Sequence, residues 1–217
     1  MAEAVNTPAK RRYDASRRLA TASETRNRMA RVAKEAFLQQ GYAATRMADI
    51  AEAAGVSLET LYAAFGPKPK LVRYLIEIAL SGQEEPIPAL EREWVRAAQA
   101  ETNPSRLIEM LAAGATQLEQ RVAPLWAAVK EAAKDDPALR ATVEELSERR
   151  LTHMRVFIDD LSSKGGLRPG LSRDTAADAV WAMNSPEFFA LFVLERGWSP
   201  SAFEAWLADT WKRLLLP

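Results

Sequence analysis

The sequence predicts an all-α protein of about nine or ten helices, and three observations support this class. Apolar residues recur at helical spacing in most segments of the 217 residues. No segment shows the strict alternation of apolar and polar residues that is typical of half-buried strands. Proline and glycine occur between the periodic segments, where helices are expected to begin and end.

The composition predicts a soluble cytoplasmic protein that needs no cofactor. The chain has no Cys, so no disulfide framework is possible, as is usual in a reducing compartment. Its first residues lack the apolar core of a signal peptide, and no later run approaches the ~20 apolar residues of a membrane helix. Because the chain has no Cys and a single His, we expect no metal site.

Charge is divided unevenly along the chain. Residues 1–75 hold 13 Lys and Arg against 7 Asp and Glu, whereas residues 76–217 hold 16 against 22. A basic module joined to an acidic one is typical of a DNA-binding regulator, because only the basic part meets phosphate. The alternative is a chance imbalance between two solvated surfaces.

Residues 1–22 are predicted to form a flexible basic arm. They are rich in Ala, Arg and Thr with few large apolar groups, so we expect no stable structure away from DNA. Such an arm can lie in a minor groove; the alternative is a mobile, solubilising tail. A first helix is then expected from Ser23 or Glu24 to Gln40, where Gly41 stops it.

Residues 45–65 have the spacing of a helix-turn-helix. Thr45 is a candidate N-cap for the first of two short helices. Gly55 follows an apolar face of that helix, at the place where a helix ends with a residue in the left-handed region. Ala51 is small enough for two helices to cross steeply at this turn.

The second helix has the features of a DNA-recognition helix. Ser57 is expected to cap it, and it runs from Leu58 to Phe65 with Leu61 facing the core. Short hydrogen-bonding groups point outward near its N-terminus, and Ala63 and Ala64 keep it slim enough for a major groove. The alternative is an ordinary turn between two helices of an all-α protein.

This segment resembles the DNA-binding domain of the TetR (tetracycline-repressor) family of transcriptional regulators. The resemblance covers about residues 24–80. The residues that carry it are Ala36-Phe37, Gly41-Tyr42, Thr45, Ile50-Ala51, Ala54-Gly55-Val56-Ser57, Thr60-Leu61-Tyr62, Phe65, Lys68 and Leu71.

The recognition helix and its flanks supply the predicted contacts with DNA. The resemblance implies that Tyr62 reaches a phosphate and that Lys68 holds another at the start of a helix. Glu59 is suited to accept from a cytosine amino group or to reduce non-specific binding. Arg46 stands where the family often has a small hydroxyl residue, and Ala64 where it usually has an aromatic residue or His. The predicted DNA-binding residues are Thr45, Arg46, Ser57, Leu58, Glu59, Thr60, Tyr62 and Lys68.

A stiff hinge at Gly66–Pro69 ends the predicted DNA-binding domain, residues 23–69. Residues 70–217 are predicted to form a helical effector-binding and dimerisation domain, which begins with a helix from Lys70 to about Leu80. The resemblance implies that this helix links DNA reading to ligand sensing; the alternative is a plain strut. Later helices are predicted at 87–101, 104–121, 123–134, 137–163, 173–195 (kinked or restarted at Pro186) and 199–215.

Large aromatic residues are concentrated in this second domain, where all six Trp lie. They are suited to line a pocket for a small apolar effector, and the family resemblance favours that interpretation over a solid helical core. His153 is either a polar anchor in the pocket or an ordinary hydrogen-bonded residue. The predicted effector-binding residues are Trp94, Met110, Leu111, Trp126, Phe157 and Trp181.

The C-terminal segment carries two adjacent amphipathic helices whose large apolar side chains need cover. Packing within the chain is one solution; a two-fold, four-helix dimer interface is the other, and the segment resembles the dimerisation region of a subset of the family. A homodimer would present two recognition helices to a palindromic operator. The predicted interface residues are Phe188, Phe192, Phe203, Trp206, Leu207, Trp211 and Leu214.

These patterns predict a ligand-responsive DNA-binding repressor that an effector releases from double-stranded DNA. The first alternative is an architectural DNA-binding protein that responds to no effector. The second is a helical enzyme or carrier, which we do not favour, because no nucleophile with a base and no phosphate loop occurs. The acidic pairs Glu144-Glu145 and Asp159-Asp160 are interpreted as solvated helix faces.

Overall fold

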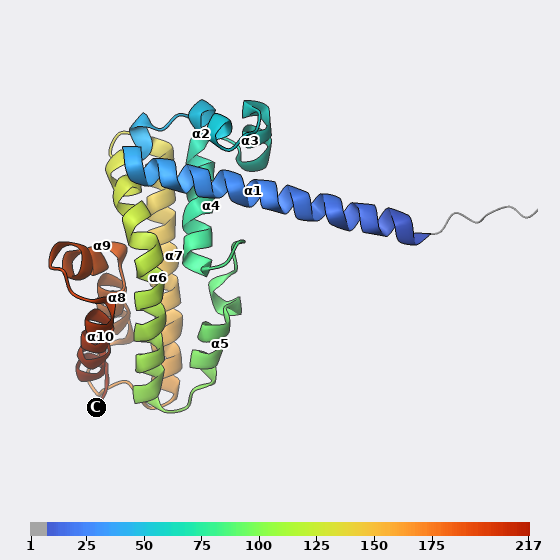
Figure 1. Ribbon diagram of the computed structural model, residues 1–217. Coiled ribbons are helices and arrows are strands. Elements are labelled where there is room, and N and C mark those ends of the chain that lie inside the picture. The colour runs from blue at the N-terminus through green and yellow to red at the C-terminus, as the bar shows by residue number, and fades with distance from the viewer. Residues whose placement is uncertain (1–7) are drawn as a thin grey trace, which may run out of the picture. The chain divides into compact units, whose positions relative to one another are not determined.

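The structure is a computed structural model that describes the backbone of residues 8–217 and the side chains of residues 21–217 (Figure 1). It divides into two compact units, Met1–Lys68 and Pro69–Pro217. Every regular element in the described residues is a helix, as predicted. None of the helices in this part of the chain combines the length and the hydropathy that a bilayer crossing requires.

The first unit holds three helices: α1 (Pro8–Ala44), α2 (Met47–Ala53) and α3 (Leu58–Phe65). α1 breaks at Gly41, whose φ of 77° lies in the left-handed region, so the predicted stop is confirmed. The predicted start is wrong, because the helix begins at Pro8 and includes residues 8–22 of the expected arm. The Ala, Arg and Lys residues of this stretch are strong helix formers, which explains the extension. Residues 1–7 and the side chains of Lys10, Arg11, Arg12, Arg17 and Arg18 lie outside the described residues.

The three helices of this unit each contribute apolar residues to the buried interior. α1 packs on α2, and α2 packs on α3. The buried apolar residues are Met29, Ala30, Ala33 and Phe37 of α1, Met47, Ile50 and Ala51 of α2 with Ala54 after it, and Leu61 and Phe65 of α3. Burial of one face leaves the opposite face of α3 in solvent.

The second unit begins inside α4 (Lys68–Ser81), whose first residue, Lys68, is the last residue of the first unit. Two long helices, α6 (Pro104–Ala132) and α7 (Pro137–Ser163), run side by side in Figure 1. α5 and α10 pack on α6, and α8 packs on α7. The bounds of the remaining elements are η1 (Ala89–Glu91), α5 (Glu93–Ala100), α8 (Arg173–Met183), α9 (Pro186–Phe189), the π-helical turn η2 (Ala190–Glu195) and α10 (Pro200–Leu215).

Local signals explain where several of these helices begin. Asn103 and Asp136 accept hydrogen bonds from the backbone N–H groups of the first turns of α6 and α7, each with a proline directly after the cap. Ser199 caps α10 in the same way, with Pro200 behind it. Such a cap satisfies backbone donors that have no partner within the helix, and proline at the first position costs no hydrogen bond.

α6 corrects one prediction, because 104–121 and 123–134 form a single helix that continues through Pro124. Proline removes one backbone donor and crowds the carbonyl one turn earlier. The helix nevertheless continues, because the residues on either side of Pro124 bury their apolar side chains. Val122, Ala123 and Leu125 are each at most 2% exposed.

α10 corrects part of the predicted dimer interface. Phe203, Leu207 and Trp211 are at most 1% exposed, and they belong to the core of the chain itself, where α10 packs on α6. They therefore offer no surface to a second copy. The remaining predicted interface residues, Phe188, Phe192, Trp206 and Leu214, are partly exposed.

Candidate DNA-binding surface and ligand cavity

The turn between α2 and α3 is built around Gly55. Its φ of 63° is left-handed, and its N–H donates to the carbonyl oxygen of Glu52 at 3.0 Å. The N–H of Val56 donates to the carbonyl oxygen of Ala51, also at 3.0 Å. This pair of hydrogen bonds is the Schellman ending of a helix, which satisfies carbonyl groups that α2 leaves unpaired. The predicted role of Gly55 is confirmed.

Ser57 fixes the start of α3. Its Oγ accepts from the backbone N–H of Thr60 at 3.2 Å, and the two hydroxyl groups lie 2.9 Å apart. The predicted cap is thereby confirmed. Leu61 is fully buried on the opposite side of the helix. The cap and this anchor hold the first turn of α3 in a defined orientation.

The predicted DNA-binding residues of α3 lie on its exposed face. Leu58 and Tyr62 are 40% and 45% exposed, and Glu59 and Thr60 are also exposed. Together with Ser57 they form a surface at the helix N-terminus, which we call the recognition face.

Thr45 and Arg46 occupy positions that differ from the prediction. Thr45 is 1% exposed, and its hydroxyl donates to the carbonyl oxygens of Gly41 and Ala36 at 2.8 and 3.2 Å. It therefore anchors the end of α1 instead of capping α2 or contacting DNA. The N-cap of α2 is Arg46, whose exposed guanidinium donates twice to Asp49, at 2.7 and 2.9 Å.

Lys68 is held at the first position of α4 by an aromatic ring. Its ammonium nitrogen lies 4.1 Å from the ring centroid of Tyr42, a cation–π contact. The contact keeps the positive charge near the positive end of a helix, where an anion is favoured. This geometry suits the predicted phosphate contact.

A cavity of about 450 Å³ lies within the second unit, lined by residues of α4, η1, α5, α6 and α7 among others. Four predicted effector-binding residues, Trp94, Leu111, Trp126 and Phe157, line it. Met110 and Trp181 do not. Met110 neighbours Leu111 on α6, and successive residues of a helix point about 100° apart. Trp181 donates its indole N–H to the carbonyl oxygen of Ser147 at 3.2 Å.

Two tryptophans of the cavity wall are held in place by specific contacts. Trp94 packs flat against Gly114 of α6, where even a Cβ atom would collide with the ring. Trp126 donates its indole N–H to the carboxylate of Glu187 at 2.9 Å, and Lys130 donates to the same oxygen at 2.8 Å. The cavity therefore has a preformed aromatic wall.

The sequence reasoning missed most of the polar residues that line the cavity. They are Glu77, Arg92, Gln99, Glu119, Arg149, Arg150, Asp160 and Asn184. His153, which the sequence analysis considered, also lines the cavity. Glu119 had a signal in the sequence, since it follows Ala115 by four residues and precedes Val122 by three. This places a carboxyl in an apolar helix stripe. The residues that face Glu119 across the cavity belong to other helices, so the sequence contains no signal that they would lie close to it.

Glu119 is 3% exposed, and burial raises its pKa to about 8, although Arg150 opposes the shift. Its Oε2 has no hydrogen-bond partner among the described residues, and the same holds for Arg150 Nε and Asn184 Oδ1. Burial also lowers the pKa of His153, with Arg149 and Arg92 adding to the effect. Several polar groups of the wall are therefore available to a ligand.

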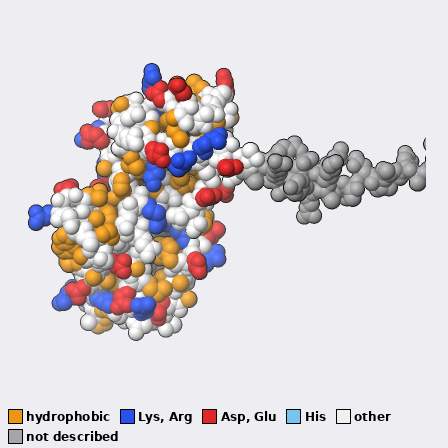
Figure 2. Space-filling model, viewed as in Figure 1, with side chains coloured by type: hydrophobic (Ala, Val, Ile, Leu, Met, Phe, Trp, Pro, Cys, Tyr) orange, Lys and Arg blue, Asp and Glu red, His pale blue; other side chains and the backbone are white. Residues whose placement is uncertain are grey.

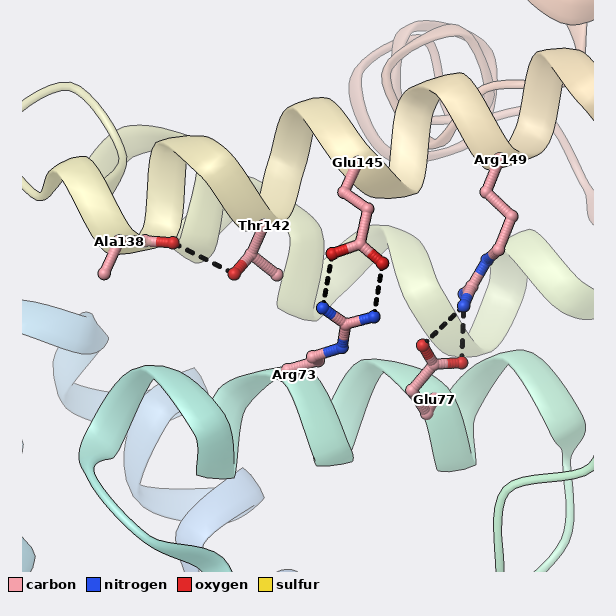
Figure 3. Close-up of polar contacts among 6 residues, drawn as sticks. All are labelled: Arg73, Glu77, Ala138, Thr142, Glu145 and Arg149. Atoms are coloured by element: carbon pink, nitrogen blue, oxygen red, sulfur yellow. Dashed lines mark hydrogen bonds and ion pairs between the residues drawn. The ribbon is translucent and has the colours of Figure 1, made fainter.

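Two ion pairs join α4 to α7 (Figure 3). Arg149 donates both terminal nitrogens to Glu77, at 2.8 and 3.0 Å, and Arg73 forms the same two-pronged contact with Glu145. In one pair α4 supplies the arginine, Arg73, and in the other it supplies the carboxylate, Glu77. Glu77 and Arg149 also line the cavity, so a ligand there touches the α4–α7 contact directly.

An exposed recognition face in one helical unit and a polar-walled cavity in another define a class of protein, the helix-turn-helix transcriptional regulators with a ligand-binding domain. Residues 30–75 match the family model of bacterial regulatory proteins, tetR family. The match spans the end of α1, all of α2 and α3, and the first half of α4. No curated protein matches the chain.

Solved structures of TetR-family and other regulators share the fold of most of the chain. A putative TetR-family regulator from Syntrophomonas wolfei matches with a TM-score of 0.72 and 15% identity, covering 88% of this chain and 94% of that one. NalD of Pseudomonas aeruginosa, described as the secondary repressor of the MexAB-OprM efflux pump, matches with a TM-score of 0.70 and 20% identity, covering 90% and 98%. FadR of Bacillus subtilis in complex with stearoyl-CoA matches with a TM-score of 0.69 and 16% identity, covering 87% of this chain and 98% of that one.

Proposed function

We propose that this protein is a transcriptional repressor that binds a palindromic operator as a homodimer and releases it when a small effector enters the cavity. The observation that carries the proposal is the recognition face, a slim helix tip held outward by the Ser57 cap and the buried Leu61. A helix of this kind reads base edges with its N-terminal residues. The matching family model and the shared fold are those of transcriptional regulators, which supports the proposal.

The cavity supports the ligand-responsive part of the proposal. Its 450 Å³ falls in the usual range for small-molecule sites, and its wall combines aromatic rings with a few polar groups. Ile76, Glu77 and Leu80 of α4 line it, and α4 is the helix that begins at Lys68 in the DNA-binding unit. A ligand that changes the position of α4 therefore changes the populations of DNA-competent and DNA-incompetent states. Among the relatives, NalD is described as a repressor and FadR was crystallised with stearoyl-CoA.

A cluster of aromatic and aliphatic side chains supports the homodimer. Phe192 lies 4.8 Å from the Trp206 ring and 4.9 Å from Trp198, centroid to centroid. Leu191 and Leu194 beside it are 49% and 54% exposed. Figure 2 shows hydrophobic side chains gathered over α9 and η2, at the left of the view. An apolar patch of this kind is a common site for a second copy of the same chain.

Selection of binding sites from a pool of random duplexes tests the proposal. We expect enrichment of an inverted repeat, because a two-fold dimer presents two recognition faces to matching half-sites. Enrichment of only flexible or A/T-rich DNA would indicate an architectural protein, and no enrichment would exclude sequence-specific binding. With the selected operator in hand, ligands that fill the cavity without changing operator affinity would remove the effector from the proposal.

A further inference from the structure

The wall of the cavity holds three arginines and three carboxyl groups. Its charged residues are Glu77, Arg92, Glu119, Arg149, Arg150 and Asp160. Glu77 pairs with Arg149, and Asp160 pairs with Lys164 at 2.7 Å, so both of these carboxylates are balanced by a cation. Three groups remain: two arginines and the carboxyl of Glu119. Burial raises the pKa of Glu119, so its carboxyl balances the arginines less than an exposed carboxylate would.

Arg150 has favourable surroundings without a ligand. Its guanidinium stacks on the ring of Trp181, 5.0 Å from the centroid, and Glu119 and Glu187 are its nearest acidic influences. The contact with the aromatic face partly compensates this cation for the water that it has lost. We therefore do not assign an anion to this end of the wall.

Arg92 lacks such compensation. It is 9% exposed, and its one hydrogen bond runs from Nε to the carbonyl oxygen of Ile87 at 3.2 Å. No carboxylate of the described residues forms an ion pair with it, and its terminal nitrogens have no partner there. Burial lowers the pKa of Arg92. Glu77 opposes this shift, and the nearby cations Arg149 and Arg121 add to it. A buried guanidinium in this position is unfavourable until an anion joins it.

We propose that the cavity binds an amphipathic anion, with a carboxylate on the terminal nitrogens of Arg92 and an aliphatic or aromatic body against Leu107, Leu111 and Phe157. The planar fork of the guanidinium matches a carboxylate through two parallel hydrogen bonds. The three apolar residues are at most 8% exposed and lie on the same cavity wall. This inference rests on the proposed function only because it treats the cavity as the effector site. It replaces the small apolar effector that the sequence predicted with a charged, amphipathic one.

The test compares three probes of equal chain length: decanoate, decanol and decylammonium. Binding to the full chain is followed by the fluorescence of its tryptophans, two of which line the cavity, and by calorimetry. We expect decanoate to bind about ten-fold or more tightly than the other two, as a charge-assisted pair in a buried site implies. Equal binding of the three, tighter binding of decylammonium, or binding of none overturns the inference.

Two variants locate the anion. Arg92→Met keeps the length of the side chain and removes its charge, and we expect it to lower decanoate affinity to that of decanol while decanol affinity stays the same. Arg96→Met is the matched control, because Arg96 is one turn further along α5, exposed, and outside the cavity wall. An Arg92→Met protein that keeps the wild-type preference for decanoate overturns the assignment.

Operator affinity separates this inference from the proposed function. If decanoate binds through Arg92 but leaves operator affinity unchanged, the anion site stands and the effector-controlled function fails. If a neutral or cationic ligand releases the operator while decanoate does not bind, the function stands and the anion site is wrong. Release of the operator by decanoate, lost in Arg92→Met, supports both.

Discussion

Ser57 and Ser172 form the same local structure in different units of the chain. Each caps a helix through its Oγ, at 3.2 Å from the N–H of Thr60 and 3.1 Å from that of Thr175. Each hydroxyl also lies within 3 Å of the threonine hydroxyl three residues later. Only the first of the two caps positions a recognition face.

This pairing gives a prediction with an internal control. Ser57→Ala and Ser172→Ala should each destabilise the protein by about 1 kcal/mol, the usual cost of a lost N-cap, measured by thermal unfolding. Only Ser57→Ala should also weaken operator binding. An equal loss of operator affinity in the two variants would show that the cap of α3 has no special role in DNA binding.

Glu119 makes stability depend on pH. Folding raises the pKa of its carboxyl from 4.5 to about 8, so between these values the folded chain keeps a proton that the unfolded chain has lost. The contribution of Glu119 to the free energy of unfolding is therefore greatest below about pH 4.5. It falls as the pH rises and becomes constant above about pH 8. Arg150, Arg121 and Glu187 also act on the carboxyl, and its own burial dominates.

Glu119→Gln should remove this dependence, because an amide of the same shape does not ionise. We expect the difference in melting temperature between variant and wild type to grow in favour of the variant from pH 5 to pH 8. The measurement is thermal unfolding at a series of pH values in matched ionic strength. A constant difference across this range would mean that Glu119 ionises normally in the folded chain.

At the scale of elements, helix boundaries with local signals were predicted well. Asn103 before Pro104 and Asp136 before Pro137 combine a side-chain cap with a proline, and both helices begin there. The continuation of α6 through Pro124 had no local signal, because it depends on apolar neighbours that other helices bury. The charged cavity wall was missed for the same reason. A sequence shows which residues share one face of a helix, but it does not show which other helix packs against that face.

The two ion pairs between α4 and α7 differ in exposure. The side chains of Arg73 and Glu145 are 38% and 52% exposed, whereas those of Arg149 and Glu77 are 36% and 19% exposed. Water screens the first pair more strongly than the second. The second pair should therefore contribute more to holding α4 on α7.

Double-mutant cycles measure this difference. With Arg→Met and Glu→Gln substitutions, we expect a coupling energy of roughly 0.2–1 kcal/mol for Arg73 with Glu145, the range of exposed pairs. The coupling of Arg149 with Glu77 should be larger, because the less exposed carboxylate is left without its partner. Denaturant unfolding gives the free energies. The reverse order would mean that burial does not control these contacts.

At the scale of the whole molecule, we expect the proposed homodimer to form through the apolar patch of η2. Leu191→Arg with Leu194→Arg places two charges on side chains that are already half exposed, so the fold should tolerate them. We expect the double variant to be a monomer by size exclusion with light scattering, and to lose operator affinity. Leu38→Arg, an exposed leucine of the first unit, should remain a dimer. A double variant that still dimerises would place the interface elsewhere.

The central claim is that the exposed tip of α3 reads DNA. The most direct test is the affinity of the selected operator for the wild type and for a Thr60→Ala, Tyr62→Ala double variant, measured by fluorescence anisotropy. Both side chains are exposed, so the double variant should unfold at nearly the same temperature as the wild type. The account predicts that its operator affinity falls by about ten-fold or more, since specific contacts contribute roughly 1–3 kcal/mol each. A folded double variant that binds the operator as tightly as the wild type would contradict it.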